Sequence, residues 1–86
     1  MEDRRKNPAR KGSSSPIRPP IREYHVVPNG RRWDVHRLNA FIGAFAYDRD
    51  TAIGMATAEA KRDTAYGMYA VVSVEEMDGT CRHVWP

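Results

Sequence analysis

The chain has 86 residues, with 14 lysines and arginines against 11 acidic residues and a formal net charge of +3. This length fits one small domain, and no apolar run approaches the roughly 18 residues that span a bilayer, so we expect no membrane partner. The single cysteine, Cys81, cannot form an internal disulfide, and the first residues lack the apolar stretch of a secretory signal. Both features predict a cytoplasmic location.

Residues 1–22 form a basic segment without a periodic apolar pattern. Four prolines and a serine run interrupt it, which predicts a disordered tail because so little apolar surface cannot offset the entropy of ordering. Basic tails neutralise phosphates, so its cations are candidate nucleic-acid-binding residues, although a merely solubilising tail is the alternative. These candidates are Arg4, Arg5, Lys6, Arg10, Lys11, Arg18 and Arg22.

The folded part, residues 23–86, begins with a predicted β-hairpin. Asn29-Gly30 is typical of a two-residue type I′ turn, which demands positive φ at both positions. The resulting register pairs Val26 with Trp33. It divides the hairpin into an apolar face of Tyr24, Val26, Trp33 and Val35 and a solvent face of Glu23, His25, Val27, Arg32, Asp34 and His36.

Two groups of side chains in the chain are candidates for a chemical site. His25, Asp34 and His36 could bind a metal or exchange protons, but a flat outer face, with His25 opposite Asp34 and Glu23 opposite His36, is the simpler interpretation. Cys81 shares a face with His83 and could be a nucleophile, but it lacks an adjoining oxyanion hole and is expected to act as a small hydrophobe. We therefore predict no catalytic residues, no metal site, no cofactor and no enzymatic activity.

Residues 41–47 are the third predicted strand, with Gly43 leaving room for a bulge. Asp48 is a good N-cap for a helix that ends between residues 63 and 67. A stripe of small residues, spaced by four positions, predicts close packing of this helix on the sheet; it consists of Ala52, Ala56 and Ala60.

A second hairpin follows, built from residues 68–75 and the last residues of the chain. A two-residue turn at Asp78-Gly79 would place Glu75 opposite Arg82, Val74 opposite His83 and Val72 opposite Trp85. The order strand, strand, strand, helix, strand, strand (β-β-β-α-β-β) predicts an α+β domain whose antiparallel sheet carries one helix on one face.

Three segments carry a resemblance to known proteins: "YHVVPNGRRWDV", "AFAYDRDTAIGMATAEAK" and "VVSVEEMDGTCR". Together they resemble a small prokaryotic family without an assigned activity, whose members combine a His-Val-Val-Pro strand, a Trp-x-Val strand and an Asp-Gly hairpin. The resemblance covers about residues 24–82, departs from the family at Gly54 and Met55, and implies a compact bacterial or phage domain.

A second resemblance, over residues 33–60, is to the arm-type DNA-binding domains of phage integrases. It is carried by "WDV", Tyr47, Ala52 and Ala56, and it implies a sheet laid into the major groove with a helix behind it. The open face of those sheets is basic, whereas here Glu23 and Asp34 share the predicted open face with Arg32.

Two functional hypotheses follow from the sequence. The first is a non-enzymatic binding protein that associates with nucleic acid through its basic tail. The alternative is a protein-interaction or homodimerisation module that uses exposed strand edges and Trp85. The aromatic residues could stack on single-stranded bases, but Tyr24 and Trp33 are expected in the core.

Overall fold

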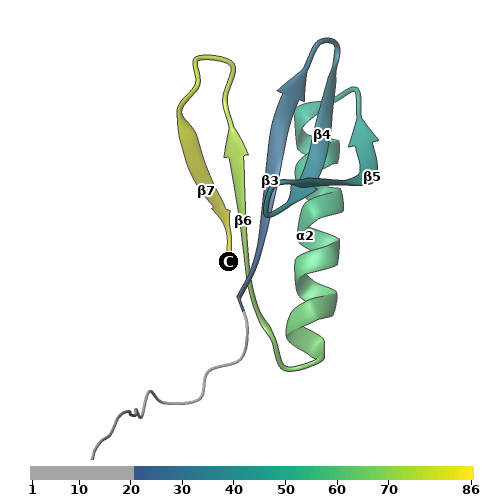
Figure 1. The fold of residues 1–86 in the computed structure, drawn as a ribbon, viewed down its shortest axis with the longest axis vertical. Helices are drawn as coiled ribbons and strands as arrows, with labels where there is room; N and C mark the ends of the chain where they lie inside the picture. The colour runs from purple at the N-terminus through teal and green to yellow at the C-terminus, as the bar shows by residue number, and fades with distance from the viewer. Residues whose placement is uncertain (1–20) are drawn as a thin grey trace, which may run out of the picture.

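The structure, a computed structural model, describes residues 21–86, and the predicted tail residues 1–20 lie outside this range. Five strands and one helix follow the predicted order, which confirms the α+β class with a helix on one face of the sheet (Figure 1). The elements are β3 (Ile21–Asn29), β4 (Arg32–Arg37), β5 (Ala40–Ala46), α2 (Arg49–Ala65), β6 (Tyr69–Glu75) and β7 (Cys81–Trp85).

The first strand starts earlier than the sequence predicts. β3 begins at Ile21, so Arg22 lies within a strand, opposite Ala70 of β6, and does not belong to a disordered tail. Pairing with β6 on one side of β3 extends the ordered backbone two residues upstream of the predicted boundary.

The strand order in the sheet is β5-β4-β3-β6-β7. Three of the four strand pairs are antiparallel, as predicted, but β3 and β6 are parallel, so the sheet is mixed. The reason is the crossover through α2. The helix carries the chain from the end of β5 back to the end of the sheet where β3 begins, and the next strand therefore runs in the same direction as β3 (Figure 1).

Helix α2 has the predicted limits and the predicted cap. The Asp48 carboxylate accepts hydrogen bonds from the Thr51 amide at 2.8 Å and from the Thr51 hydroxyl at 2.7 Å, which lowers the pKa of Asp48. Ala52, Ala56 and Ala60 are fully buried, so the helix backbone lies close to the sheet. Within the described residues, no helix has the length and apolar character of a membrane span.

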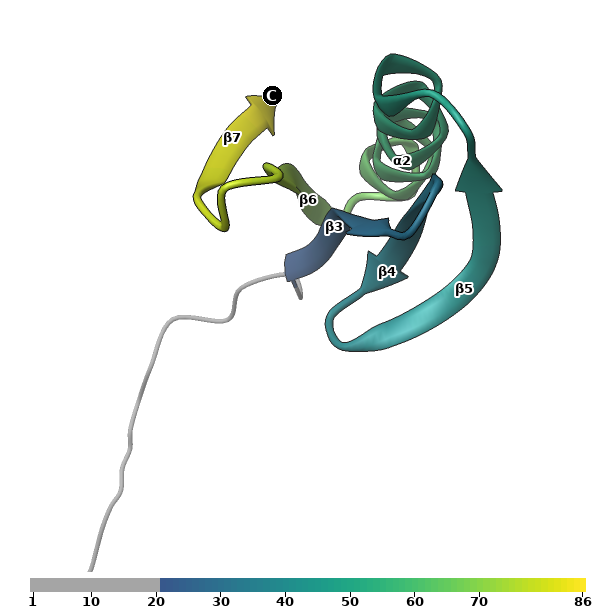
Figure 2. The ribbon, with the colours of Figure 1, turned by 90° about the horizontal axis from the view of Figure 1, so that it is seen from above.

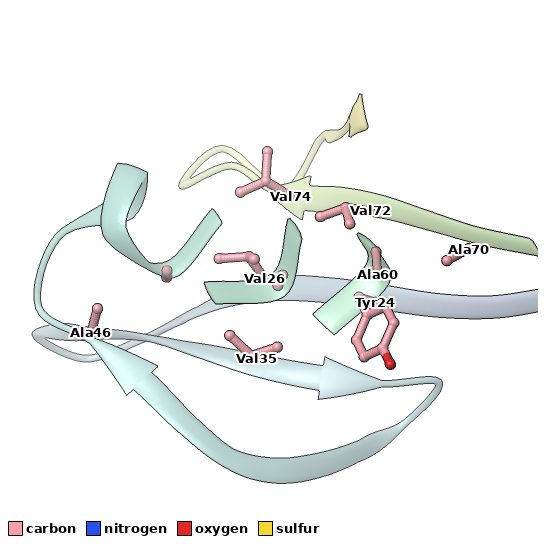
Figure 3. Close-up of a cluster of buried hydrophobic side chains, with 10 residues drawn as sticks. Tyr24, Val26, Val35, Ala46, Ala60, Ala70, Val72 and Val74 are labelled. Carbon is pink, nitrogen blue, oxygen red and sulfur yellow. The ribbon is translucent and has the colours of Figure 1, made fainter. Parts of the chain in front are cut away.

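The core lies between the sheet and α2 (Figure 3). Its largest fully buried side chains are Tyr24, Val26, Val35, Val72 and Val74, from three adjacent strands. Burying each such valine contributes about 1.5–3 kcal/mol of transfer free energy. Trp33 and Trp85 are partly buried and pack against this cluster, so both predicted core aromatics, Tyr24 and Trp33, are found at the core.

Tyr24 also links the sheet to the end of helix α2 through a hydrogen bond. Its hydroxyl donates a hydrogen bond to the Asp63 carboxylate on α2. Burial of the ring, followed by this hydrogen bond, raises the pKa of Tyr24 because both disfavour the phenolate.

The first hairpin turns one residue later than predicted. The loop is Gly30-Arg31, with positive φ at Gly30 and an ordinary φ at Arg31, the pattern of a type II′ turn, which requires glycine first. Val26 now faces Val35 and His25 faces His36, so the predicted His25–Asp34 and Glu23–His36 pairs are wrong. The register has shifted by two residues, and an even shift leaves every side chain on its predicted face.

The second hairpin has a longer turn than predicted. The Asp78 carboxylate accepts hydrogen bonds from the Thr80 amide and hydroxyl, and Glu76 pairs with Thr80 across the turn. Val72 faces Trp85 as predicted, but a bulge follows. Ser73 then faces His83 and Glu75 faces Cys81, so the predicted Val74–His83 and Glu75–Arg82 pairs are wrong.

This one-residue shift exchanges the faces of residues 81–83 of β7, whereas Trp85 keeps its predicted place opposite Val72. Arg82 moves to the helix side, where its Nε lies 3.1 Å from Glu76 Oε2. Glu76 also accepts two hydrogen bonds from Arg49, at 2.9 Å and 2.6 Å, and these two arginines, Arg49 first, lower the pKa of Glu76. The cluster joins the start of α2 to the β6–β7 turn and leaves Cys81 and His83 on the opposite face of the sheet.

Candidate functional site on the open face of the sheet

The sheet curves around α2, and its other face is not covered by any described element (Figure 2). We call this surface the open face. All three histidines of the chain lie there in one row across four strands, because His36 pairs with His25, His25 with Ser73, and Ser73 with His83. The open face therefore gathers the three histidines together with Asp34, whereas the helix-covered face holds the valine and alanine core.

Asp34 on this face is buried, contrary to the predicted exposure to solvent. Only 5% of its surface is accessible. Asn29 Nδ2 donates a hydrogen bond to Oδ2 at 2.8 Å, and Arg32 Nε lies 2.7 Å from Oδ1 as a charge contact outside ideal hydrogen-bond geometry. Burial arises because strand β5 places Phe45 directly opposite Asp34.

The Arg32 guanidinium is held from a second side by aromatic rings. Its central carbon lies 4.3 Å from the centre of the Phe45 ring and 5.6 Å from that of Phe41. Phe45 meets Tyr47 edge-on, with ring centres 5.8 Å apart, and His36 lies 6.1 Å from Phe41. We name these residues the arginine–aromatic patch: Arg32, Asp34, His36, Phe41, Phe45 and Tyr47.

The two phenylalanines were not identified as functional candidates from the sequence. Phe41 and Phe45 pair with His36 and Asp34 across β4 and β5. Between them Gly43 adopts φ +86° and the register of the strand pair shifts, which confirms the predicted bulge. Alternation along this strand could have placed both rings on the open face, but the sequence does not reveal how the bulge brings them to Arg32.

A surface pocket of about 200 Å³ adjoins the patch at His36, and we call this pocket the hollow. It is formed by β3, β4, β6, β7 and the β4–β5 turn. The turn residue Leu38 has a φ of +56°, unusual for a side chain of this kind, and its amide donates to the Glu23 carbonyl at 2.8 Å. The lining residues are His25, Val27, His36, Leu38, Asn39, Glu75 and Cys81.

Glu75 contributes an unpaired carboxylate to the hollow. It is half-buried, and within the described residues no hydrogen bond or ion pair satisfies its side chain. Its predicted partner, Arg82, lies on the other face of the sheet and binds Glu76 instead. A half-buried acceptor without a partner is available to a ligand that can donate hydrogen bonds.

The residues of the metal and nucleophile sites considered from the sequence all lie on the open face. The Asp34 carboxylate contacts Arg32 and Asn29, and no group of three or more metal-ligating side chains converges within residues 21–86. Cys81 is exposed, not packed as a small hydrophobe. His83 is exposed as well, with Nε2 3.2 Å from the carbonyl oxygen of Pro86.

The predicted nucleic-acid-binding residues lie largely beyond the described range. Arg22 is the one that the structure places, in β3 on the helix side of the sheet, at the level of Ala70. The other six lie among residues 1–20; these are Arg4, Arg5, Lys6, Arg10, Lys11 and Arg18.

The outermost strands, β5 and β7, are the edges that the alternative hypothesis would use. The β4–β5 and β6–β7 pairs each contain a register shift. Bulges near an edge discourage pairing with a second sheet, so the edges give the interaction module little support.

Comparisons of this chain with protein-family models, curated proteins and solved structures gave no match. Both resemblances inferred from the sequence therefore stay predictions. The fold and the site define a small α+β domain with one uncovered sheet face, on which an arginine–aromatic patch adjoins a polar hollow.

Proposed function

We propose that the protein is a non-enzymatic binding protein that associates with nucleic acid through its basic N-terminal segment and the open face of its sheet. The observation that carries the proposal is the position of Arg32. Its guanidinium is contacted by the buried Asp34 and stacked on Phe45. The side chain is thereby ordered before any ligand binds, which reduces the entropy cost of binding.

Arginine in this arrangement suits nucleic acid. A guanidinium group offers several N–H donors in one plane and binds phosphate with two of them. Exposed aromatic rings beside it, Phe41 and Tyr47, offer faces for stacking of bases, which is a sequence-tolerant interaction. Cation and rings lie together on a surface that no described element covers.

The charge distribution supports a role for the N-terminal segment. Residues 21–86 contain eight basic and nine acidic residues, so the folded domain has no excess of positive charge. Residues 1–20 contain six basic and two acidic residues. Neutralisation of phosphates by this segment would supply affinity and strong salt dependence, whereas contacts to the open face would supply orientation.

The decisive experiment is fluorescence anisotropy with labelled single-stranded DNA, RNA and duplex DNA at two salt concentrations. Arg32→Lys keeps the positive charge but loses the planar group, and we expect affinity to fall about fivefold for the preferred ligand. Arg62→Lys, on the exposed side of α2, is the matched control and should bind like the parent protein. Equal affinity of both variants would refute the role of Arg32.

A second variant tests the N-terminal segment in the full chain. Replacing its six basic residues by glutamine should flatten the salt dependence of binding, because fewer counterions are released. An unchanged slope would mean that these residues do not contact phosphate, and the proposed division of labour would be wrong.

A further inference from the structure

We propose that the hollow on the open face holds one unpaired nucleobase, that guanine fits it best, and that the protein therefore prefers single strands to duplexes. The inference rests on the proposed function and names its ligand. Four features of the hollow carry it: its volume, its walls, the Glu75 carboxylate, which has no partner among residues 21–86, and the His36 contact that joins the hollow to the arginine–aromatic patch.

The volume suits a single ring system. At about 200 Å³ the hollow is smaller than the roughly 300–1,000 Å³ of sites that enclose drug-sized ligands. A base inside a duplex is stacked on both faces and paired along its edge, so it could enter only after leaving the helix. Unpaired bases in single strands are splayed out at little cost.

The walls suit an aromatic ring with a polar edge. Two imidazoles, His25 and His36, stand on neighbouring strands and offer flat surfaces, and Val27 and Leu38 add apolar contact. Histidine is among the side chains on which unpaired bases stack. The amide of Asn39 and the carboxylate of Glu75 supply the polar groups that would read the edge of the base.

Glu75 selects among the bases by hydrogen bonding. Its carboxylate only accepts, so it matches an edge with two adjacent N–H donors. Guanine presents N1–H and N2–H side by side. Adenine and cytosine each present one amino group next to an acceptor nitrogen, and the single N–H of thymine or uracil lies between two carbonyls. Guanine is thus the base that can satisfy both carboxylate oxygens.

The hollow and the arginine–aromatic patch share a residue. His36 lines the hollow and also lies against Phe41, whose ring is beneath Arg32. We place the backbone of a nucleotide whose base enters the hollow along His36 and Phe41, toward the Arg32 guanidinium. The same side chains would then bind the base and a neighbouring phosphate.

Glu75 also provides the sharpest test, because its charge opposes nonspecific binding. A protein that recognised phosphates alone would bind more tightly when a carboxylate is removed from the contact surface. If Glu75 reads guanine, Glu75→Gln weakens binding of guanine-containing strands and leaves other strands unchanged or bound more tightly. Glu59→Gln on α2 removes the same charge from the opposite side of the molecule and is the matched control.

The measurement uses the full chain and a short oligothymidylate, compared with versions that carry one central guanine, adenine or cytosine and with a duplex of the guanine strand. We expect the guanine strand to bind about tenfold more tightly than the others and than the duplex. Glu75→Gln should abolish this preference, and Glu59→Gln should retain it.

Cys81 allows a test without any substitution at the recognition site. It is the single cysteine of the chain, it is exposed, and it lines the hollow. The guanine oligonucleotide should therefore slow alkylation of the thiol by iodoacetamide, whereas the oligothymidylate at equal occupancy should slow it less.

The outcomes separate the two proposals. Equal affinity for all four strands and the duplex, with Arg32→Lys still weakening binding, would overturn the guanine pocket and leave the proposed function standing. A preference for adenine or cytosine that Glu75→Gln does not change would also overturn it. Absence of binding to every strand would overturn both proposals.

Discussion

The two faces of the sheet are built from alternating residues of the same strands, yet they are organised differently. The centre of the helix-covered face is lined by valines and alanines, and Val26, Val72 and Val74 are fully buried. The open face carries histidines, acids and arginine, and its order comes from contacts within the sheet, such as Asp34 with Arg32. A surface without a covering layer can therefore still be preorganised, and that is the property a binding site requires.

The largest effect is expected from a comparison of two neighbouring residues on β6, one on each face of the sheet. Val72→Asn places an amide without partners in the core, and we expect the free energy of unfolding to fall by about 3 kcal/mol. Ser73→Asn makes the same side chain on the open face and should change stability by less than about 1 kcal/mol. Urea denaturation followed by circular dichroism measures both, and similar losses would show that the open face is packed like the core.

The next test measures whether the buried Asp34 on the open face contributes to the stability of the fold. Asp34→Ala removes the buried partner of Arg32 and Asn29, and we expect a loss of about 2 kcal/mol. Glu23→Ala, on the same face but half exposed, should stay within about 0.5 kcal/mol of the parent protein. If both variants unfold at the same urea concentration, Asp34 does not organise the surface.

A smaller effect is expected where the core meets the last turn of α2. Tyr24→Phe removes the hydrogen bond to Asp63 while keeping the ring in the core, at a cost of about 1 kcal/mol. The measurement is the urea midpoint at neutral pH. Thr64→Val, at an exposed position on the same end of α2, serves as the comparison.

The pH dependence of Tyr24 follows from the direction of its shift. Its pKa is raised in the folded protein, so the folded state holds the proton more tightly than the unfolded chain does. This stabilisation is complete below the unfolded pKa of about 10 and is lost as pH rises through the folded value. The stability difference between the parent protein and Tyr24→Phe should therefore shrink at high pH, and a constant difference would contradict the assignment.

The smallest effect concerns the turn that borders the hollow. Leu38 has a left-handed backbone, which asparagine adopts more easily, and its side chain is 57% exposed. Leu38→Asn should raise the free energy of unfolding by about 0.5 kcal/mol. Leu38→Ala removes the same apolar contacts without this backbone preference and should give no gain, so equal stability of both variants would rule out strain at Leu38.

The two hairpins show how far the sequence determines this fold. In each, the glycine signal located the reversal but not the turn type. At Gly30 the predicted strand register was wrong by two residues. This left Val26 and Val35 on the predicted face, so the core was predicted correctly. After Val72 the predicted register of β6 and β7 was wrong by one residue, and Cys81 and His83 therefore lie on the other face of the sheet.

The candidate site was hidden from the sequence for the same physical reason. The hollow depends on residues from four strands, and the neighbour of Glu75 depends on a turn stabilised by the Asp78 side chain. Burial of Asp34 depends on where β5 bends at Gly43. Periodicity predicts which residues share a strand face, whereas these contacts are set by register and curvature.

Strand β3 occupies the middle of the five-stranded sheet, and Ile21 is its first residue. The twenty residues that precede Ile21 are thus joined to one end of the central strand, and Arg32 lies at the other end of this strand, opposite Asn29. Under the proposed function, a nucleic-acid strand bound by those residues would have to run along β3, roughly 26 Å at about 3.3 Å per residue, to reach Arg32. Binding by the N-terminal segment would raise the effective concentration of the nucleic-acid strand at the open face. The two individually weak contacts, to the segment and to the open face, would then combine into one tighter attachment.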